Sequence, residues 1–224
     1  MKRTLLVLVL ATFGTALPAV AGTVDVKLTG VGGANQGGVY VAPYYLSING
    51  GKSVSVICDD FSHEVYVGET WTATINTFSN LNGTRFGSAD KQEYEEAAWL
   101  YMQFMKDPSQ AGNINFALWA LFTPFATESD SGFTTKGTNS AEAWYNDAIH
   151  WYDAGAKGVD FADFYIITPT NLKGSNSPQE YLYYCPNKQQ TSPTPEPSSL
   201  FLLGTGLVGI GGLVRKRVTS SSAS

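Results

Sequence analysis

VYVAPYYLSI (residues 39–48), NGG (49–51) and KSVSVI (52–57) follow one another in the chain and decide its fold. The first run is rich in aromatic and β-branched residues, and the last alternates polar with apolar residues, so both have the composition of strands. Asn49-Gly50-Gly51 offers the positive-φ positions that a tight hairpin turn requires. The stretch therefore predicts an antiparallel β-hairpin.

Further strands are predicted on both sides of this hairpin. Val24, Val26 and Leu28 alternate with polar residues, as in a half-buried strand, whereas the glycine-rich segment 30–38 is expected to be a loop. Strand composition continues at 65–75 and returns at 163–170 and 180–185.

The middle of the chain changes to a helical period. Three amphipathic helices are predicted, over 91–105, from Asn113 or Asn115 to 122, and over 141–154. Pro124 ends the second helix. The expected N-caps are Ser88 or Asp90 for the first helix and Asn139 or Ser140 for the third.

The predicted order is strands, then helices, then strands, which favours an α+β fold over alternating α/β. We expect an antiparallel β-sandwich or barrel-like sheet with a three-helix insertion. This body spans residues 22–188 and is long enough for one domain with a real core.

The amino terminus has the three parts of a secretory signal peptide. Lys2 and Arg3 precede an apolar run, and Ala19 and Ala21 before Gly22 form a small-x-small cleavage site. Residues 1–21 are therefore expected to be removed by signal peptidase. The body is exported.

The carboxy terminus also has three parts in a fixed order. Residues 189–197 form a proline-rich linker, which resists helix formation. Residues 198–214 are apolar, and as a helix they would span about 25 Å, slightly less than a hydrocarbon core of about 30 Å. Residues 215–224 are basic and serine-rich and are expected to stay cytoplasmic. The apolar segment is thus predicted to be a transmembrane helix that holds the protein transiently.

This tail resembles a PEP-CTERM sorting tail. The residues that carry the resemblance are Pro195, Glu196, Pro197, Arg215, Lys216 and Arg217. In that family an exosortase-type membrane peptidase processes the tail, in Gram-negative bacteria that make exopolysaccharide. The resemblance implies such a peptidase as partner, brief residence in the inner membrane, and a final place in the periplasm, at the cell surface or outside the cell. It also implies an association with exopolysaccharide or biofilm.

The body is strongly acidic. Five of the 14 basic residues and one of the 19 acidic residues, Glu196, lie in the terminal segments, which leaves nine basic against 18 acidic residues in the body and a net charge of about −9. Because neutralisation of phosphates supplies most non-specific affinity for nucleic acid, this charge excludes a nucleic-acid partner.

Two distant segments resemble the framework of Cys-Gln thioester domains from bacterial surfaces. They are Val56–Phe61, which contains Cys58, and Asn115–Trp119. In that family a Cys near a strand end and a Gln condense to an internal thioester that captures an amine or hydroxyl on a target. Asn115 stands where the family has Gln and is one methylene shorter. The resemblance therefore implies a non-reactive relative of the fold, with a covalent adhesin that uses Cys58 and Asn115 as an alternative.

A disulfide is a second alternative for Cys58. Cys58 and Cys185 are the two cysteines of an exported body, and such a compartment favours oxidation. Closing so long a loop would stabilise the fold by about 4 to 5 kcal/mol in the chain-entropy model. A disulfide would exclude the thioester, because one sulfur cannot form both bonds. The third alternative for Cys58 is a buried free thiol.

Asp59, Asp60, His63 and Glu64 form the densest polar cluster of the body. Carboxylates with one imidazole suit a divalent cation. An acidic turn after a strand is more often a solvated loop whose Asp caps its own backbone, and the other histidine, His150, lies on a predicted helix. We therefore expect no metal and no cofactor.

Catalytic signatures do not occur in the sequence. It has no G-x-S-x-G elbow, no phosphate-binding glycine loop and no metalloprotease motif. The sequence predicts a non-enzymatic, exported protein of the envelope or extracellular matrix. Most of the many aromatic residues are spaced as core residues are in helices and strands. Because carbohydrate-binding surfaces also use aromatic rings, a carbohydrate-binding module is an alternative.

Overall fold

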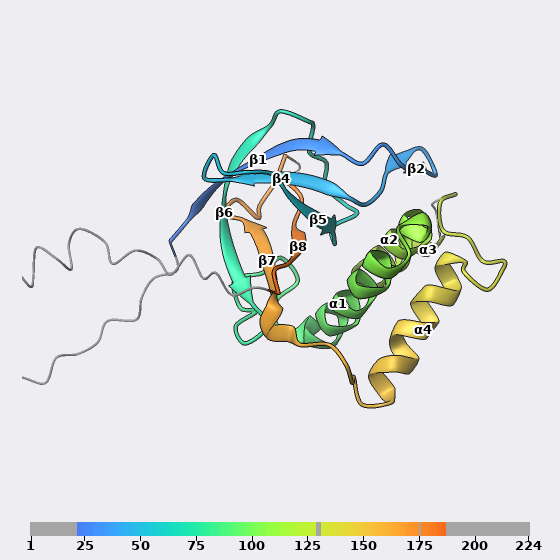
Figure 1. Cartoon of the computed structure of the whole chain (residues 1–224). Helices are drawn as coiled ribbons and strands as arrows, with labels where there is room; N and C mark the ends of the chain where they lie inside the picture. The colour runs from blue at the N-terminus through green and yellow to red at the C-terminus, as the bar shows by residue number, and fades with distance from the viewer. Residues whose placement is uncertain (1–21, 129–130, 175, 187–224) are drawn as a thin grey trace, which may run out of the picture.

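The computed structural model describes residues 22–128, 131–174 and 176–186 (Figure 1). The predicted signal peptide (1–21), the linker (189–197), the apolar segment (198–214) and the basic end (215–224) lie outside the described residues. Among the residues that are described, no helix combines the length and the apolar character needed to cross a bilayer.

Six antiparallel strands form a closed barrel, which confirms the predicted α+β class and the barrel-like sheet (Figure 1). In order around the barrel they are β1 (Val24–Val31), β4 (Tyr44–Ile48), β5 (Val54–Cys58), β8 (Tyr181–Tyr184), β7 (Phe164–Pro169) and β6 (Thr70–Thr77). The two strands that follow the helices, β7 and β8, lie between β5 and β6 and complete the barrel.

The hairpin predicted at 39–57 is present as β4 and β5. Tyr44 faces Val56 and Leu46 faces Val54 across the pair. Asn49 and Gly50 in the turn have φ angles of 50° and 69°, the left-handed region that Asn and Gly tolerate best. The Asn49 side chain also accepts a 2.9 Å hydrogen bond from the Asp25 amide, which ties the turn to β1.

Three strand predictions were wrong in detail. Residues 39–48 do not form one strand, because Pro43 has no amide hydrogen to donate to a ladder and the chain breaks before β4. The predicted loop 30–38 instead contains β2 (Asn35–Gln36), which pairs with β3 (Val39–Tyr40) as a small separate sheet. β6 begins at Thr70 rather than at 65, after a turn at Gly68 with φ 101°.

The three predicted helices are α1 (Lys91–Lys106), α2 (Ala111–Phe122) and α4 (Ala141–Asp153). Ser140 caps α4 by accepting a hydrogen bond from the Ala143 amide, as predicted. Asp90 stands at the N-cap position of α1, but its side chain makes no capping bond. Short elements were not predicted: α3 (Phe125–Glu128) and the 3₁₀ turns Ser88–Asp90, Pro108–Gln110 and Phe161–Asp163.

α2 begins at Ala111, earlier than the predicted Asn113 or Asn115. The 3₁₀ turn before it is capped by Asp107, whose side chain accepts a hydrogen bond from the Ser109 amide, and this turn leads directly into the helix. The helix ends at Phe122, before Pro124, as predicted. The early start places Asn115 in the second turn of α2, where its side chain lies fully inside the protein.

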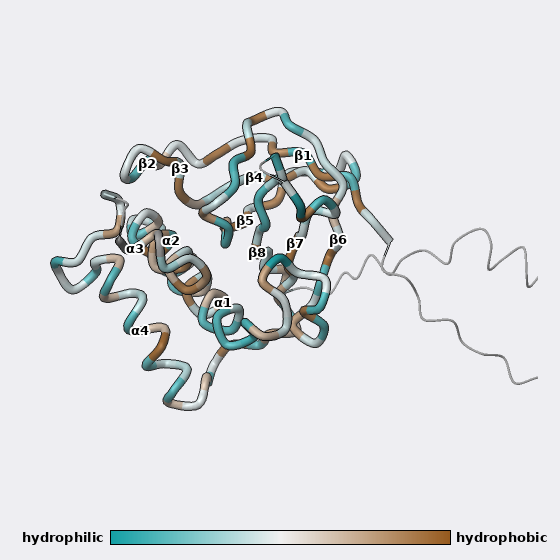
Figure 2. Tube along the Cα trace, turned by 180° about the vertical axis from the view of Figure 1, so that it is seen from behind, coloured by the Kyte–Doolittle hydropathy of each residue, from teal (hydrophilic) through white to brown (hydrophobic). Residues whose placement is uncertain are grey.

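α2 lies between α4 and the barrel, and both views show α4 on the far side of the α1/α2 pair (Figures 1 and 2). Two aromatic side chains of α2, Phe116 and Trp119, belong to the same buried cluster as side chains from the barrel strands. The Phe61 ring packs on both, with centroid distances of 6.0 and 5.1 Å. Burial of each ring stabilises the fold by about 2 to 3 kcal/mol, so these contacts hold α2 against the segment that follows β5.

Candidate functional site

β5 ends inside the protein, and this end carries the first candidate residue. Cys58 is completely buried and faces Tyr181 across the β5/β8 pair. Its thiol donates a 3.3 Å hydrogen bond to the Asp60 carbonyl oxygen. Burial raises the pKa of the Cys58 thiol well above its usual value, and the charges of Asp60 and Asp59 raise it further. The sulfur is therefore held as a thiol, which is a weak nucleophile.

Asn115 contacts Cys58 from α2, so the structure brings the two predicted residues together. The hydrogen bonds of the Asn115 side chain go to main-chain atoms and not to the sulfur. Asn115 Nδ2 donates a 2.9 Å hydrogen bond to the Cys58 carbonyl oxygen, and Asn115 Oδ1 accepts a 2.8 Å hydrogen bond from the Ala42 amide. The side chain is fully buried and joins α2 to two segments of the barrel region. Its carboxamide satisfies main-chain groups that would otherwise be buried without partners.

Of the alternatives for Cys58, the disulfide with Cys185 is not formed in the structure. Cys58 is a buried thiol that is not bonded to Cys185. The reason is strand register: Cys58 lies opposite Tyr181, so Cys185 is four residues further along the partner segment, toward the start of β5. A disulfide requires Cα atoms no more than about 7 Å apart, and this offset exceeds that reach.

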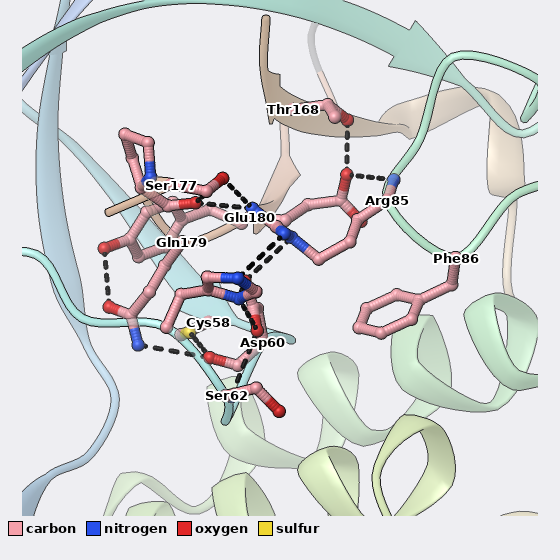
Figure 3. Close-up of polar contacts among 12 residues, drawn as sticks. Cys58, Asp60, Ser62, Arg85, Phe86, Thr168, Ser177, Gln179 and Glu180 are labelled. Carbon is pink, nitrogen blue, oxygen red and sulfur yellow. Dashed lines mark hydrogen bonds and ion pairs between the residues drawn. The ribbon is translucent and has the colours of Figure 1, made fainter. Parts of the chain in front are cut away.

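The polar cluster after β5 is built around a buried ion pair rather than a solvated turn. Asp60 is 1% exposed, and its Oδ2 lies 2.8 Å from Arg85 Nε (Figure 3). His63 Nδ1 lies 3.0 Å from both carboxylate oxygens of Asp60. The Arg85 Nη2 atom donates hydrogen bonds to Ser177 Oγ (2.8 Å) and to the Pro178 carbonyl oxygen (2.6 Å). Asp60 thus anchors the loop that follows β5 to the segment that leads into β8.

Glu180 is a second buried acid beside this ion pair (Figure 3). It accepts hydrogen bonds from Tyr94 Oη (2.5 Å), Thr168 Oγ1 (2.5 Å) and the Arg85 amide (2.8 Å). Burial raises the pKa of the Glu180 carboxyl.

Asp59 is the third buried acid, and among the described residues neither of its carboxyl oxygens has a hydrogen-bond partner. Burial, followed by the nearby charges of Glu180 and Asp60, raises the pKa of Asp59 well above its usual value. One guanidinium, on Arg85, thus lies among three carboxyl groups, and this balance favours the protonated form of Asp59.

Arg85 and Glu180 were missed by the sequence analysis. A signal did exist for Arg85, because it is the one arginine between Arg3 and Arg215. An arginine that is singular in an acidic body points to a bidentate or buried role that lysine does not fill. Glu180 gives no comparable signal, since an acid before an aromatic strand usually marks a solvated end.

The four residues weighed as metal ligands do not come together as one set of ligands. Asp60 and His63 bind each other and Arg85, Asp59 lies inside the protein, and Glu64 is bonded to the Tyr66 hydroxyl at 2.8 Å. Across the described ranges, no group of three or more His, Cys, Asp or Glu side chains is arranged to hold a metal ion.

A cleft of about 480 Å³ opens next to the ion pair. Its walls come from the segment between β5 and β6, with His63, Glu64 and Tyr66, from the start of β6, with Trp71, and from the segment before β8. Its volume lies within the range of about 300 to 1,000 Å³ that is usual for ligand sites.

Comparison with known proteins bears on the tail and on the body separately. Residues 193–217 match the PEP-CTERM protein-sorting motif, which confirms the interpretation of Pro195-Glu196-Pro197 and Arg215-Lys216-Arg217. The body is similar to the N-terminal domain of the Streptococcus pyogenes pilus tip adhesin Cpa, with 11% identity and a TM-score of 0.42 over 73% of this chain and 94% of that one. No curated protein matches the sequence. The sorting motif implies an exported protein that an exosortase processes at the membrane.

Proposed function

We propose that the exported body is a non-enzymatic binding module of the cell envelope or extracellular matrix, associated with exopolysaccharide. After signal peptidase removes residues 1–21, the tail holds the protein in the inner membrane until an exosortase-type peptidase cuts near Pro195-Glu196-Pro197. The motif match at 193–217 supports this processing step. The body is then released folded, to the periplasm, the cell surface or the medium.

One observation supports a non-covalent module over a covalent adhesin. The Asn115 carboxamide is engaged on both sides, by the Ala42 amide and by the Cys58 carbonyl oxygen. A thioester would form by attack of the Cys58 sulfur on the carboxamide carbon, with the amide nitrogen leaving as ammonia that carries away the thiol proton. That route would remove Nδ2 with the ammonia and leave the buried Cys58 carbonyl oxygen without this donor, at a cost of about 1 to 3 kcal/mol. It would also need the thiolate, which burial disfavours.

The test is the intact mass of the purified chain together with its reaction with methylamine. We expect the mass of the unmodified processed chain, with no change on addition of methylamine. A mass lower by one ammonia, regained as a methylamine adduct, would overturn the proposal in favour of the covalent adhesin. That second candidate is favoured by one observation, the contact between the buried Cys58 and Asn115.

The cleft beside β6 supports glycan binding as the mode of association. It combines an exposed tyrosine and a tryptophan with carboxylate, hydroxyl and imidazole groups, which are the side-chain types that contact sugar rings and hydroxyls. Affinity electrophoresis in gels that contain the producing organism's own exopolysaccharide tests this mode. Retarded migration is expected, and migration identical to that in a plain gel would contradict it.

A further inference from the structure

The cleft has two aromatic walls that are held in different ways. Tyr66 is 65% exposed, so its ring face is open to a ligand. Trp71 is half-buried, and its ring also stacks on Tyr181 with a centroid distance of 6.2 Å and an interplanar angle of 26°. Because Tyr181 is completely buried in the barrel, the Trp71 ring is fixed to the core. The cleft thus pairs a rigid ring with an accessible one.

Two carboxylates are fixed around Tyr66. Glu64 Oε2 accepts a 2.8 Å hydrogen bond from the Tyr66 hydroxyl, and Glu69 Oε2 accepts a 2.8 Å hydrogen bond from the Tyr66 amide. Both glutamates line the cleft. Each carboxylate has acceptor capacity beyond the one bond that it makes, because an ionised carboxyl offers about four lone-pair sites. The site is therefore preorganised to accept hydrogen bonds from a ligand.

The charge of the cleft is negative. Among the described residues that line it there is no lysine or arginine. His63 is the one imidazole in the lining; its Nδ1 is bonded to the buried Asp60, and Arg85 is paired with the same carboxylate. The body as a whole carries nine more acidic than basic groups. A ligand with carboxylates would meet repulsion here.

We propose that this cleft binds a sugar unit of a glycan that carries no carboxylate, with free amino groups favoured. The ring packs on Tyr66 and Trp71, its hydroxyls donate to Glu64 and Glu69, and an ammonium group on the ring gains from both carboxylates. This inference rests on the proposed glycan association and adds to it the place of binding and the charge class of the glycan. Uronic-acid polymers are excluded as preferred ligands.

The test uses the full-length chain in detergent micelles, titrated with three oligosaccharides of equal length at mildly acidic pH. They are a chito-oligosaccharide with free amines, a neutral cello-oligosaccharide and an oligogalacturonate. We expect affinity to fall in that order, and the chito-oligosaccharide to lose affinity as salt is added, because exposed charges are screened. Tightest binding of the oligogalacturonate would overturn the charge assignment.

Substitutions locate the site. Tyr66→Ala should weaken binding of the chito-oligosaccharide about five- to tenfold, the range expected for one lost ring contact. Tyr66→Phe, which keeps the ring, should retain at least about half of the original affinity for the chito-oligosaccharide. Glu64→Gln should weaken binding about two- to fivefold. The matched controls are Tyr40→Ala, at a tyrosine that is 55% exposed outside the cleft, and the exposed Glu142→Gln, and both should leave affinity unchanged.

The outcomes separate the two levels of the proposal. If none of the three oligosaccharides binds, and exopolysaccharide gels do not retard the protein, glycan association itself is wrong. If binding occurs but Tyr66→Ala and Glu64→Gln bind like the controls, glycan association stands and the cleft assignment is overturned. Because Tyr66 and Glu64 are on the surface, loss of binding with an unchanged unfolding transition cannot be attributed to misfolding.

Discussion

Asn115 Nδ2 lies 2.9 Å from the Cys58 carbonyl oxygen, so a side chain of the helical layer closes the end of a barrel strand. The same carboxamide accepts a hydrogen bond from Ala42, which precedes β4. One buried amide thus joins three segments that are far apart in the sequence. Asn115 occupies the sequence position of the reactive partner of the cysteine in thioester domains. Its side chain, however, is hydrogen-bonded to the main chain of Cys58 and Ala42.

Replacing Asn115 with alanine should lower the free energy of unfolding by about 2 to 4 kcal/mol. The change leaves the Ala42 amide and the Cys58 carbonyl oxygen buried without partners and opens a small cavity. Urea unfolding followed by tryptophan fluorescence measures the loss. Asn146→Ala, at an exposed position of α4, is the matched control and should stay within about 0.5 kcal/mol of the original. Equal stability of the two variants would contradict a clamping role for Asn115.

Asp59→Asn should flatten the dependence of stability on pH. The folded pKa of Asp59 is raised, so the folded state binds its proton more tightly than the unfolded state, whose pKa is about 4. The resulting stabilisation is fully present below that unfolded pKa and is lost as the pH rises through the folded pKa.

Urea titrations between about pH 4 and pH 8 test this prediction. The variant should match the original protein at the acidic end and exceed it at neutral pH. Some slope should remain, because the pKa of Glu180 is also raised by burial. Asp147→Asn, at an exposed site of α4, should reproduce the original profile. The prediction fails if Asp59→Asn does so as well.

Cys58 should resist alkylation while the protein is folded. Its side chain is inaccessible and its thiol pKa is raised, so both access and thiolate fraction are low. The measurement is the rate of reaction with iodoacetamide at neutral pH in a Cys185→Ser background, which leaves Cys58 as the only thiol. We expect labelling at least about a hundredfold slower than in urea, with a rate set by opening of the structure. Labelling at the rate of the unfolded chain would show that the sulfur is open to solvent.

Arg85→Met should destabilise the protein by about 3 to 5 kcal/mol. The change removes the partner of the buried Asp60 and the donors to Ser177 Oγ and the Pro178 carbonyl oxygen. Thermal unfolding monitored by circular dichroism measures the effect, and the exposed Lys52→Met serves as control. A loss no larger than that of the control would mean that the ion pair has no structural role.

Glu196→Ala should block processing of the tail, because Glu196 is the central residue of the Pro-Glu-Pro motif within the matched segment 193–217. Mass spectrometry of the carboxy-terminal peptide from cells gives the readout. The original protein should end upstream of Arg215, whereas the variant should retain Arg215-Lys216-Arg217. A mature original protein that still carries Arg215 would contradict temporary anchoring.

The class of the fold could be predicted from local patterns, and its details could not. The turn at Asn49-Gly50, the Ser140 cap and the stop at Pro124 are local signals whose physics is contained in a few neighbouring residues. The break before β4 and the late start of β6 depend on how a closed barrel spaces its strands, which no single stretch encodes.

The candidate site was predictable only in part for the same reason. The resemblance around Cys58 and Asn115 placed the two residues together correctly, but not the atoms that meet. The sequence left the disulfide open as an alternative because it does not encode the strand register, which sets Cys58 opposite Tyr181. The ion pair of Asp60 with Arg85 joins residues whose meeting depends on the whole barrel, so the sequence showed Asp60 as a member of a solvated turn.

Closure of the barrel has a consequence for the self-association of an exported protein. An open sheet exposes a row of unpaired amides and carbonyls at each outer strand, and these can pair with another copy and start fibres. In the six-stranded ring of the described body, β1 pairs with β6, so every strand of the ring has two neighbours. The body should therefore have little tendency to polymerise through its main sheet, even at high concentration.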